Sequence, residues 1–270
     1  MNKYQKKQFK ISLVYLLILV IIGLGVYLLI KPKLSTCSDG IQNQGEAGID
    51  CGGPCSLCPW QLQEDLEINL IQAIKTQNNY VDLVAEVKNP NRDFGAESFS
   101  YIFNLYDFQE NLIFSKKGVS YILPQETKYI IEQKVLINSK IYRIELKTDN
   151  ITWQKLVNYE EPELLIRGQN FNQSEDFTGV IGTLENRSDY DFNAINIWTI
   201  LLDKESNILG AGKIELKTIL SKENRYFEIS WPFSILGQVE KVNIAAKTNI
   251  FLDENFMKRH GGNREKFQEY

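Results

Sequence analysis

Histidine is almost missing from this 270-residue chain, and its scarcity limits the chemistry that the protein can perform. The single histidine, His260, lies in the polar C-terminal segment 253–270, which the sequence predicts to be a disordered tail. Catalysis by a serine or cysteine with a histidine base needs an imidazole that a folded site holds and orients. A lone histidine in such a tail has no orienting partner, so the sequence predicts no catalytic residues of this class.

An excess of positive charge is also missing. The chain has 30 lysines and arginines against 34 aspartates and glutamates, which leaves a formal net charge of −4. A protein that binds nucleic acid needs a basic field to gather phosphates, so nucleic acid is not a predicted partner. Phosphate-cradling loops are missing as well, because Gly23 and Gly25 lie in an apolar run and Gly210 and Gly212 lie in a strand pattern. The sequence therefore predicts no nucleotide cofactor.

Charge and proline are both missing from residues 11–30, ISLVYLLILVIIGLGVYLLI. With a rise of 1.5 Å per helical residue, a run of this length spans a hydrocarbon core of about 30 Å. The sequence therefore predicts a transmembrane helix over residues 11–30 that contacts the lipid bilayer. A cleaved signal peptide has a shorter apolar region and a small-residue cleavage site, whereas this run ends in Lys31-Pro32-Lys33.

The lysines that flank the apolar run predict its orientation. Four lysines precede the run and two follow it closely, so the positive-inside rule places residues 1–10 in the cytoplasm as a short tail. The rest of the chain then lies outside, as a single-pass protein of the cell membrane. Residues 34–37, Leu-Ser-Thr-Cys, also resemble a bacterial lipobox, although Thr36 replaces the usual small residue. A lipid anchor at Cys37 is the alternative.

Cysteine is missing from every position after residue 58. All four cysteines lie in the glycine-rich segment 34–59, at Cys37, Cys51, Cys55 and Cys58. This segment has too few large apolar residues to bury a core that offsets chain entropy, so its order must come from cross-links or a metal. Outside the cell the cysteines would form two disulfides, with all three pairings open, whereas in the cytosol they would indicate zinc.

The same segment contains hard oxygen ligands in a glycine-punctuated loop, namely Asp39, Asn43, Glu46 and Asp50. Oxygen ligands on a flexible loop are typical of calcium sites. Their spacing is not that of an EF-hand, and acidic loop residues are more often simply solvated. Calcium is therefore one prediction for this loop, and a turn held by disulfides alone is the other.

From residue 66 onward, apolar residues alternate with polar ones, as in Phe99, Tyr101, Phe103 and Leu105. The pattern also repeats, because residues 83–135 align with residues 180–232. At an offset of 97, Leu83, Asn89, Leu123 and Tyr129 match Val180, Asn186, Leu220 and Tyr226, and at 96 Asp107 matches Asp203. A polar boundary lies near residues 158–162. The sequence thus predicts an all-β fold of two tandem sandwiches, 60–158 and 159–252, after one transmembrane helix.

Both copies resemble the FxLYD-type β-sandwich of bacterial envelope proteins, which is similar to water-stress and late-embryogenesis-abundant sandwiches. The residues that carry the resemblance are Val87–Asn89, Phe103–Asp107 and Leu123-Pro124 in the first copy, and Leu184–Asn186, Ile200–Asp203 and Leu220-Ser221 in the second. The second copy lacks the tyrosine before its aspartate. The resemblance implies an immunoglobulin-like fold without a known catalytic residue set.

The cysteine-rich segment resembles a short motif of secreted and surface proteins. The matching residues are Cys37, Asp39-Gly40, Asn43, Glu46, Asp50-Cys51-Gly52-Gly53, Cys55 and Cys58. Such a motif usually lies beside a membrane anchor or between extracellular domains. This setting agrees with the predicted topology.

Together these features predict a membrane-anchored, extracytoplasmic binding or spacer protein of the cell envelope that is not an enzyme. Its expected partner is an envelope protein of unidentified kind. One alternative is an accessory subunit of a secretion, pilus or cell-wall machine, with the membrane helix as a contact through residues 23–25. Another is a carboxylate-based hydrolase of envelope polymers, which would need two carboxyl groups within about 10 Å of each other.

Overall fold

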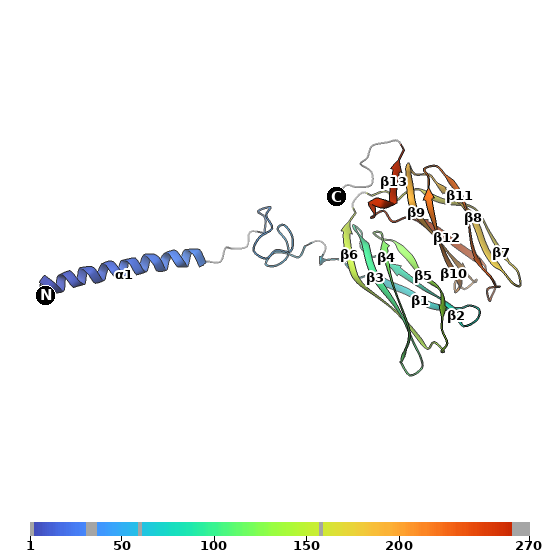
Figure 1. The fold of residues 1–270 in the computed structure, drawn as a ribbon, viewed down its shortest axis with the longest axis horizontal. Helices are drawn as coiled ribbons and strands as arrows, with labels where there is room; N and C mark the ends of the chain where they lie inside the picture. The colour runs from blue at the N-terminus through green and yellow to red at the C-terminus, as the bar shows by residue number, and fades with distance from the viewer. Residues whose placement is uncertain (1–2, 31–36, 59–60, 157–158, 261–270) are drawn as a thin grey trace. The chain divides into compact units, whose positions relative to one another are not determined.

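The computed structural model describes residues 3–30, 37–58, 61–156 and 159–260 (Figure 1). The chain divides into two compact units, residues 1–62 and residues 63–270, which are described in turn. The first unit contains one helix and the cysteine-rich segment. The second contains all of the β-strands. An all-β fold after one N-terminal helix is therefore confirmed.

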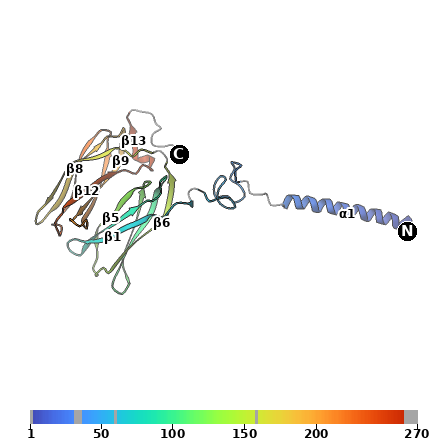
Figure 2. The same cartoon turned by 180° about the vertical axis from the view of Figure 1, so that it is seen from behind.

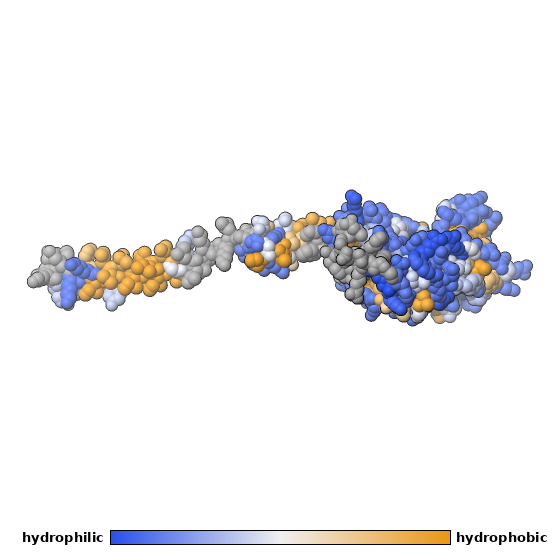
Figure 3. Space-filling model, turned by 90° about the horizontal axis from the view of Figure 1, so that it is seen from above, coloured by the Kyte–Doolittle hydropathy of each residue, from blue (hydrophilic) through white to orange (hydrophobic). Residues whose placement is uncertain are grey.

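The helix α1 covers Lys3–Ile30. Its apolar stretch, Lys7–Tyr27, has a mean hydropathy of 2.5 and is long enough to cross a membrane by length and composition. Figure 3 shows a hydrophobic surface along most of this stretch, after the hydrophilic residues at its N-terminal end. The helix begins before the predicted span because lysine and glutamine are good helix formers, so the basic N-terminal segment continues the same helix.

The second unit contains two β-sandwiches, each built from two antiparallel sheets (Figures 1 and 2). The first sandwich has sheets of order β1-β2-β5 and β4-β3-β6, with β1 Glu67–Lys75, β2 Tyr80–Lys88, β3 Phe94–Tyr106, β4 Leu112–Ile122, β5 Thr127–Leu136 and β6 Arg143–Lys155. The second has sheets of order β11-β8-β7 and β10-β9-β12, with β7 Leu164–Gln173, β8 Thr178–Asn186, β9 Tyr190–Leu202, β10 Ile208–Ile219, β11 Asn224–Trp231 and β12 Lys241–Lys247.

The predicted alternation places the core of the first sandwich correctly. Phe99, Phe103 and Leu105 on β3 are completely buried and pack against Leu83 on β2 of the facing sheet. Side chains two apart on a strand point to the same face, so one face of each sheet is apolar and meets the other. The second sandwich encloses an equivalent cluster around Phe192.

The C-terminal segment corrects a prediction made from the sequence. Residues 253–260 are not a disordered tail: the 3-10 helix η2, Asp253–Asn255, leads into strand β13, Phe256–Arg259, which pairs with the start of β9. The Phe256 ring packs edge-on against Phe192, with ring centroids 5.4 Å apart. A short polar segment with a single aromatic anchor has too weak a period to be recognised as a strand. Residues 261–270 lie outside the described residues.

His260 is also held by the fold. Its backbone N–H donates to the Asp189 carbonyl at 2.7 Å, and its Nε2 lies 2.9 Å from a carboxylate oxygen of Asp191. Burial favours the neutral form of Asp191, yet His260, the Ser221 N–H and Lys258 hold its pKa below the usual value. The His260 side chain is therefore exposed, as the sequence predicts, but it is held in a defined position at the end of β13 and does not lie in a disordered tail.

The asparagines of the sequence repeat form the same corner in each sandwich. Asn89 Nδ2 donates to the carbonyl oxygens of Phe94 and Leu123 at 2.7 and 2.9 Å. Asn186 Nδ2 donates to Tyr190 and Leu220 at 2.8 and 2.9 Å. Both asparagines are completely buried. A buried amide that satisfies two loop carbonyls explains why both copies contain asparagine at this position.

The aspartates of the repeat close equivalent hairpins. Asp107 Oδ1 accepts the Asn111 N–H at 3.0 Å, and Asp203 Oδ1 accepts the Asn207 N–H at 2.8 Å. The Asn111 and Asn207 side chains also donate to these carboxylates, and these side-chain bonds, followed by the backbone bonds, hold the pKa of each aspartate below its usual value. Side-chain bonds of this kind stabilise a turn of the backbone.

A third buried cluster joins the two sandwiches. The outer face of the β1-β2-β5 sheet contributes Val84 and Ile131, which pack against Ile200 and Ala211 on β9 and β10. Gln72 Nε2 also donates to the Ile208 carbonyl at 2.9 Å across this contact. The two sandwiches therefore form one unit with a shared apolar interface.

Candidate functional site

The cysteine-rich segment is closed by two disulfides, Cys37–Cys55 and Cys51–Cys58, and no described cysteine is free. This is one of the three pairings that the sequence left open. The sulfur atoms of Cys37 and Cys55 lie near the Glu46 carboxylate, but zinc binds thiolates and a disulfide sulfur carries no such charge. A disulfide-bonded Cys37 also has no thiol for a lipid.

The four predicted calcium ligands are hydrogen-bonded within the loop, but among the described residues the carboxylates of Asp39, Glu46 and Asp50 do not converge within 4.8 Å of one another. The Asp50 carboxylate accepts hydrogen bonds from two backbone N–H groups. Its Oδ1 accepts from Asp39 and its Oδ2 from Gly40, both at 2.9 Å. Glu46 Oε2 accepts the N–H groups of Asn43 and Asp50, both at 3.2 Å. The Asp50 and Glu46 carboxylates thus hold the loop together by hydrogen bonds. The oxygen atoms that accept these bonds are the same atoms that would coordinate a cation. Calcium at these residues stays a prediction, which a calcium-dependent rise in melting temperature would support.

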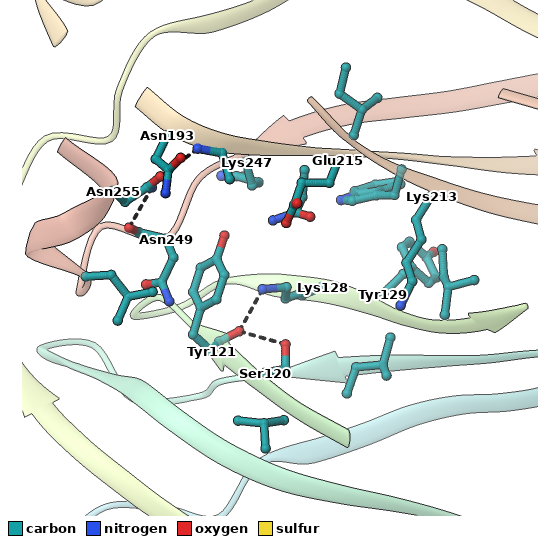
Figure 4. A pocket seen from close by; sticks show the side chains of 18 of the residues that line it. Ser120, Tyr121, Lys128, Tyr129, Asn193, Lys213, Glu215, Lys247, Asn249 and Asn255 are labelled. Carbon is teal, nitrogen blue, oxygen red and sulfur yellow. Dashed lines mark hydrogen bonds between the residues drawn. The ribbon is translucent and has the colours of Figure 1, made fainter. Parts of the chain in front are cut away.

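A cleft between the two sandwiches of the second unit is the candidate functional site. It has a volume of about 340 Å³. One wall comes from β4 and β5 of the first sandwich, and the other from β9, β10, β12 and η2 of the second (Figure 4). The size lies at the lower end of the range for small-molecule sites. Among the described residues that line the cleft, none is histidine or cysteine.

Lys128 on β5 occupies the first wall. Its ammonium donates to the Tyr121 carbonyl at 2.8 Å and lies 3.3 Å from the centroid of the Tyr121 ring. Burial is the largest cause that lowers the pKa of Lys128, to about 8, with the charge of Glu126 opposing the shift. The like charges of Lys247 and Lys213 add to the lowering. Charges of both signs therefore act on this ammonium, and burial is the main reason why its pKa falls.

Tyr121, at the end of β4, supplies an unsatisfied hydroxyl group. The side chain is only 7% exposed, and its oxygen has no hydrogen-bond partner among the described residues. Figure 4 shows the ring rising from the first wall toward Asn249 and Lys247, with the hydroxyl in the space between the sandwiches. Burial, and then the charges of Glu126 and Glu161, raises the Tyr121 pKa. The phenol therefore keeps its proton and can donate it to a ligand.

The second wall is positioned by Asn255 of η2. Its Oδ1 accepts the Ala194 N–H at 2.9 Å, and its Nδ2 donates to the Asn249 carbonyl at 3.0 Å. These bonds tie the loop after β12 to β9. They also hold Asn249 at the edge of the cleft, opposite the Tyr121 hydroxyl (Figure 4).

The charges of the second wall are partly balanced. Lys247 on β12 pairs with Glu161, and Glu215 on β10 lies 3.5 Å from Lys217. Lys213, also on β10, is exposed, and its charge acts on Lys128 across the cleft. Of these lysines, Lys213 is the one best placed to meet a ligand entering from solvent.

Aromatic contacts fix the distance between the two walls. Tyr129 and Trp198, one from each sandwich, meet edge to face with ring centroids 5.1 Å apart. Tyr121 meets Phe251 in the same way at 6.3 Å. Such pairs are worth about 1 kcal/mol each beyond the area they bury. The width of the cleft is therefore set by residues that pack against each other across the two sandwiches.

None of the residues predicted from the sequence as metal or disulfide residues lies in this cleft. The two sandwiches meet through residues far apart in the chain, and no local motif records that contact. One signal was available, because Leu83-Val84-Ala85 and Ile200-Leu201-Leu202 are continuous apolar runs where strands with one solvated face would alternate. Continuous runs indicate strands buried on both faces, and hence a second packing surface.

Comparisons with known proteins add little. A scan against protein-family models and a search of curated proteins each found no match. Among solved structures, the chain is similar to a red sea bream transglutaminase, with a TM-score of 0.21 and 12% sequence identity. That match covers 66% of this chain and 29% of the transglutaminase chain. At this TM-score the similarity carries no argument about fold or activity.

Proposed function

We propose that this protein is a non-enzymatic binding module of the cell envelope, held at the membrane by α1 with both sandwiches outside the cytoplasm. The observation that carries the proposal is the cleft between the sandwiches, whose walls are fixed by a shared apolar interface. A spacer needs no such interface, because tandem domains that do not contact each other can still separate two points along the chain. We therefore favour binding over spacing.

Two further features support the location. The apolar stretch of α1 is followed in sequence by two disulfides, which persist in oxidising compartments and are rare in the cytosol. Positive charge concentrated before the helix favours a cytoplasmic N-terminus. A lipid bilayer around α1 and an envelope ligand or protein at the sandwiches are the proposed partners.

The location is tested by adding protease to intact spheroplasts that express the full chain with a tag at the C-terminus. We expect the tagged sandwiches to be digested while a cytoplasmic marker protein survives. Protection of the tag until detergent is added would contradict the proposed orientation. Release of the tagged protein into the medium without α1 would show that the helix is a cleaved signal.

The absence of catalysis is tested by covalent labelling with a fluorophosphonate. Ser120 Oγ and Lys128 Nζ both donate to the Tyr121 carbonyl, so a serine and a lysine of lowered pKa lie close together, as in some serine hydrolases. We expect no labelling of the full chain. Labelling that disappears in Ser120→Ala would contradict the proposal and identify a hydrolase.

A further inference from the structure

We propose that the cleft between the sandwiches binds a small organic oxyanion, a carboxylate or phosphate group carried on a compact ligand, through Tyr121, Lys128 and Lys213. This inference rests on the proposed binding function and names its ligand class. It is carried by the buried, unpartnered Tyr121 hydroxyl and by the ammonium groups of Lys128 and Lys213, which line the same cleft.

The Tyr121 hydroxyl is the group whose missing hydrogen bond a ligand would supply. A buried hydroxyl without a hydrogen bond destabilises a fold, so such groups are rare unless they serve a purpose. A phenol with a raised pKa donates one hydrogen bond, and an oxyanion is its strongest acceptor. Replacing Tyr121 with phenylalanine would remove the unsatisfied group while keeping the ring that packs on Phe251.

Charged groups of both signs surround the cleft, and the lysines without an ion-pair partner are the groups that would bind an anion. Facing Lys128 are Lys213 and Glu215 from β10, Lys247 from β12, Glu254 from η2 and Glu126 from the turn before β5. Glu215 and Lys247 have their own partners, Lys217 and Glu161. Glu126 accepts the Leu123 N–H at 2.8 Å. Glu126 and Glu254 keep their negative charges. Among the described residues Lys128 and Lys213 form no salt bridge, so they are the cationic donors of the cleft, and their mutual repulsion falls when an anion lies between them.

The ligand body would lie against the aromatic part of the cleft. Tyr129 lies next to Lys213 on one side of the space (Figure 4). Trp198 also lines the cleft and packs against the Tyr129 ring. Flat apolar surfaces beside two ammonium groups fit a ligand with one oxyanion and a small ring or chain. A cleft of this volume admits a compact molecule and excludes a folded protein domain.

The test uses the full chain in nanodiscs of uncharged lipid, so that the bilayer contributes no anions. Benzoate and inorganic phosphate are titrated by calorimetry at constant ionic strength, with chloride as the reference salt. Saturable heat with benzoate alone would show that the ligand group is a carboxylate. Saturable heat with phosphate alone would show that it is a phosphate. Saturable heat with both would show that the cleft binds oxyanions in general. No saturable heat for either probe beyond chloride overturns the inference.

Variants decide whether the heat comes from the cleft. Tyr121→Phe and Lys213→Ala should each weaken binding roughly tenfold, because each removes one hydrogen bond to a charged group. Tyr121→Phe should also melt at the same or a higher temperature, since it removes an orphan hydroxyl. Lys117→Ala on β4, which removes an exposed charge outside the cleft, should leave affinity within about twofold of the parent.

Equal losses in Lys213→Ala and Lys117→Ala would show diffuse attraction to the surface and overturn the inference. Affinity should also fall as the pH rises through about 8, because Lys128 loses its charge there. These outcomes are independent of the proposed function, which protease access and fluorophosphonate labelling test. A protein that passes those tests but binds neither probe remains a membrane-anchored binding module with a different ligand.

Discussion

Single side chains decide most of the loop geometry in this protein. Asn89 and Asn186 each satisfy two carbonyl oxygens inside a corner, and Asp107 and Asp203 each cap a hairpin. These four residues were visible in the sequence as matches between the two copies. Their roles follow from chemistry, because short amide and carboxylate side chains can bond to backbone groups a few residues away.

Replacing Asn186 with alanine should destabilise the second sandwich by about 2–4 kcal/mol, because two buried carbonyls lose their donor. Asn172→Ala, at an exposed position of β7, is the matched control and should change stability by less than about 0.5 kcal/mol. Denaturant unfolding of the full chain in detergent, followed by tryptophan fluorescence, measures both. Equal effects of the two variants would contradict the role of the buried corner.

Lys128 should make stability depend on pH. Its folded-state pKa of about 8 lies below the ordinary value of 10.5, so between these values the unfolded chain binds a proton that the folded chain does not. Stability therefore rises as the pH increases from about 8 to 10.5, by on the order of 2 kcal/mol. Lys128→Met should flatten this slope in melting experiments, whereas Lys117→Met should preserve it. An unchanged slope in Lys128→Met would refute the lowered pKa.

At the scale of elements, two short segments are ordered by unusual means. The cysteine-rich loop depends on disulfides, carboxylate staples and glycines with positive φ, among them Gly53 at +58°. The C-terminal segment depends on strand pairing and one aromatic anchor. Neither has the apolar period that predicts an element from sequence, so the sequence predicts a cross-linked loop for the first and a disordered tail for the second.

Gly53→Ala should prevent correct closure of the loop. A Cβ at this position would lie 2.3 Å from the Gly45 carbonyl oxygen, which is backbone and has little freedom to move. Gly40→Ala has a similar positive φ of +72° but open space around it, so it isolates the effect of strain alone. Thiol titration of the non-reduced, denatured protein should find free cysteine in Gly53→Ala only. Free thiols in both variants would show that the positive φ, and not the contact with the Gly45 carbonyl, prevents closure of the loop.

Ending the chain after Leu252 should destabilise the second sandwich, because it removes β13 and the Phe256 ring that packs on Phe192. The expected loss is about 3–5 kcal/mol, comparable to deleting a buried aromatic side chain. Ending the chain after His260 instead should leave the melting temperature unchanged. Melting of the two shortened proteins in detergent compares them. Identical behaviour would show that β13 contributes nothing to the sandwich.

At the scale of the whole second unit, the shared cluster makes the two sandwiches interdependent. Ile131 is 1% exposed, yet it belongs to the shared cluster and not to the core of its own sandwich. A separated first sandwich would therefore expose it to water. The predicted ranges 60–158 and 159–252 divide this cluster between them, and the second range also ends before β13.

Ile131→Asp should uncouple the sandwiches by placing a charge in their interface. We expect one cooperative melting transition of the parent to split into two in calorimetry, with the first sandwich still β-rich by circular dichroism. Leu112→Asp, at an exposed position of β4, should melt as the parent does. A single transition at an unchanged temperature in Ile131→Asp would mean that the interface contributes no stability.

The sequence alone determined the class of structure: a run without charge predicts a helix for a bilayer, period-2 alternation predicts strands, and a 97-residue offset predicts two copies. These signals are local, since each depends on which faces of one element are apolar. Only the tertiary structure decided the disulfide pairing, the continuation of the second sandwich into β13, and the cleft with Tyr121 and Lys128. Those features join residues distant in the chain, such as Val84 with Ala211. Whether a residue is buried at such a contact depends on how two folded sheets pack together. The periodicity within one strand does not indicate which sheet packs against it.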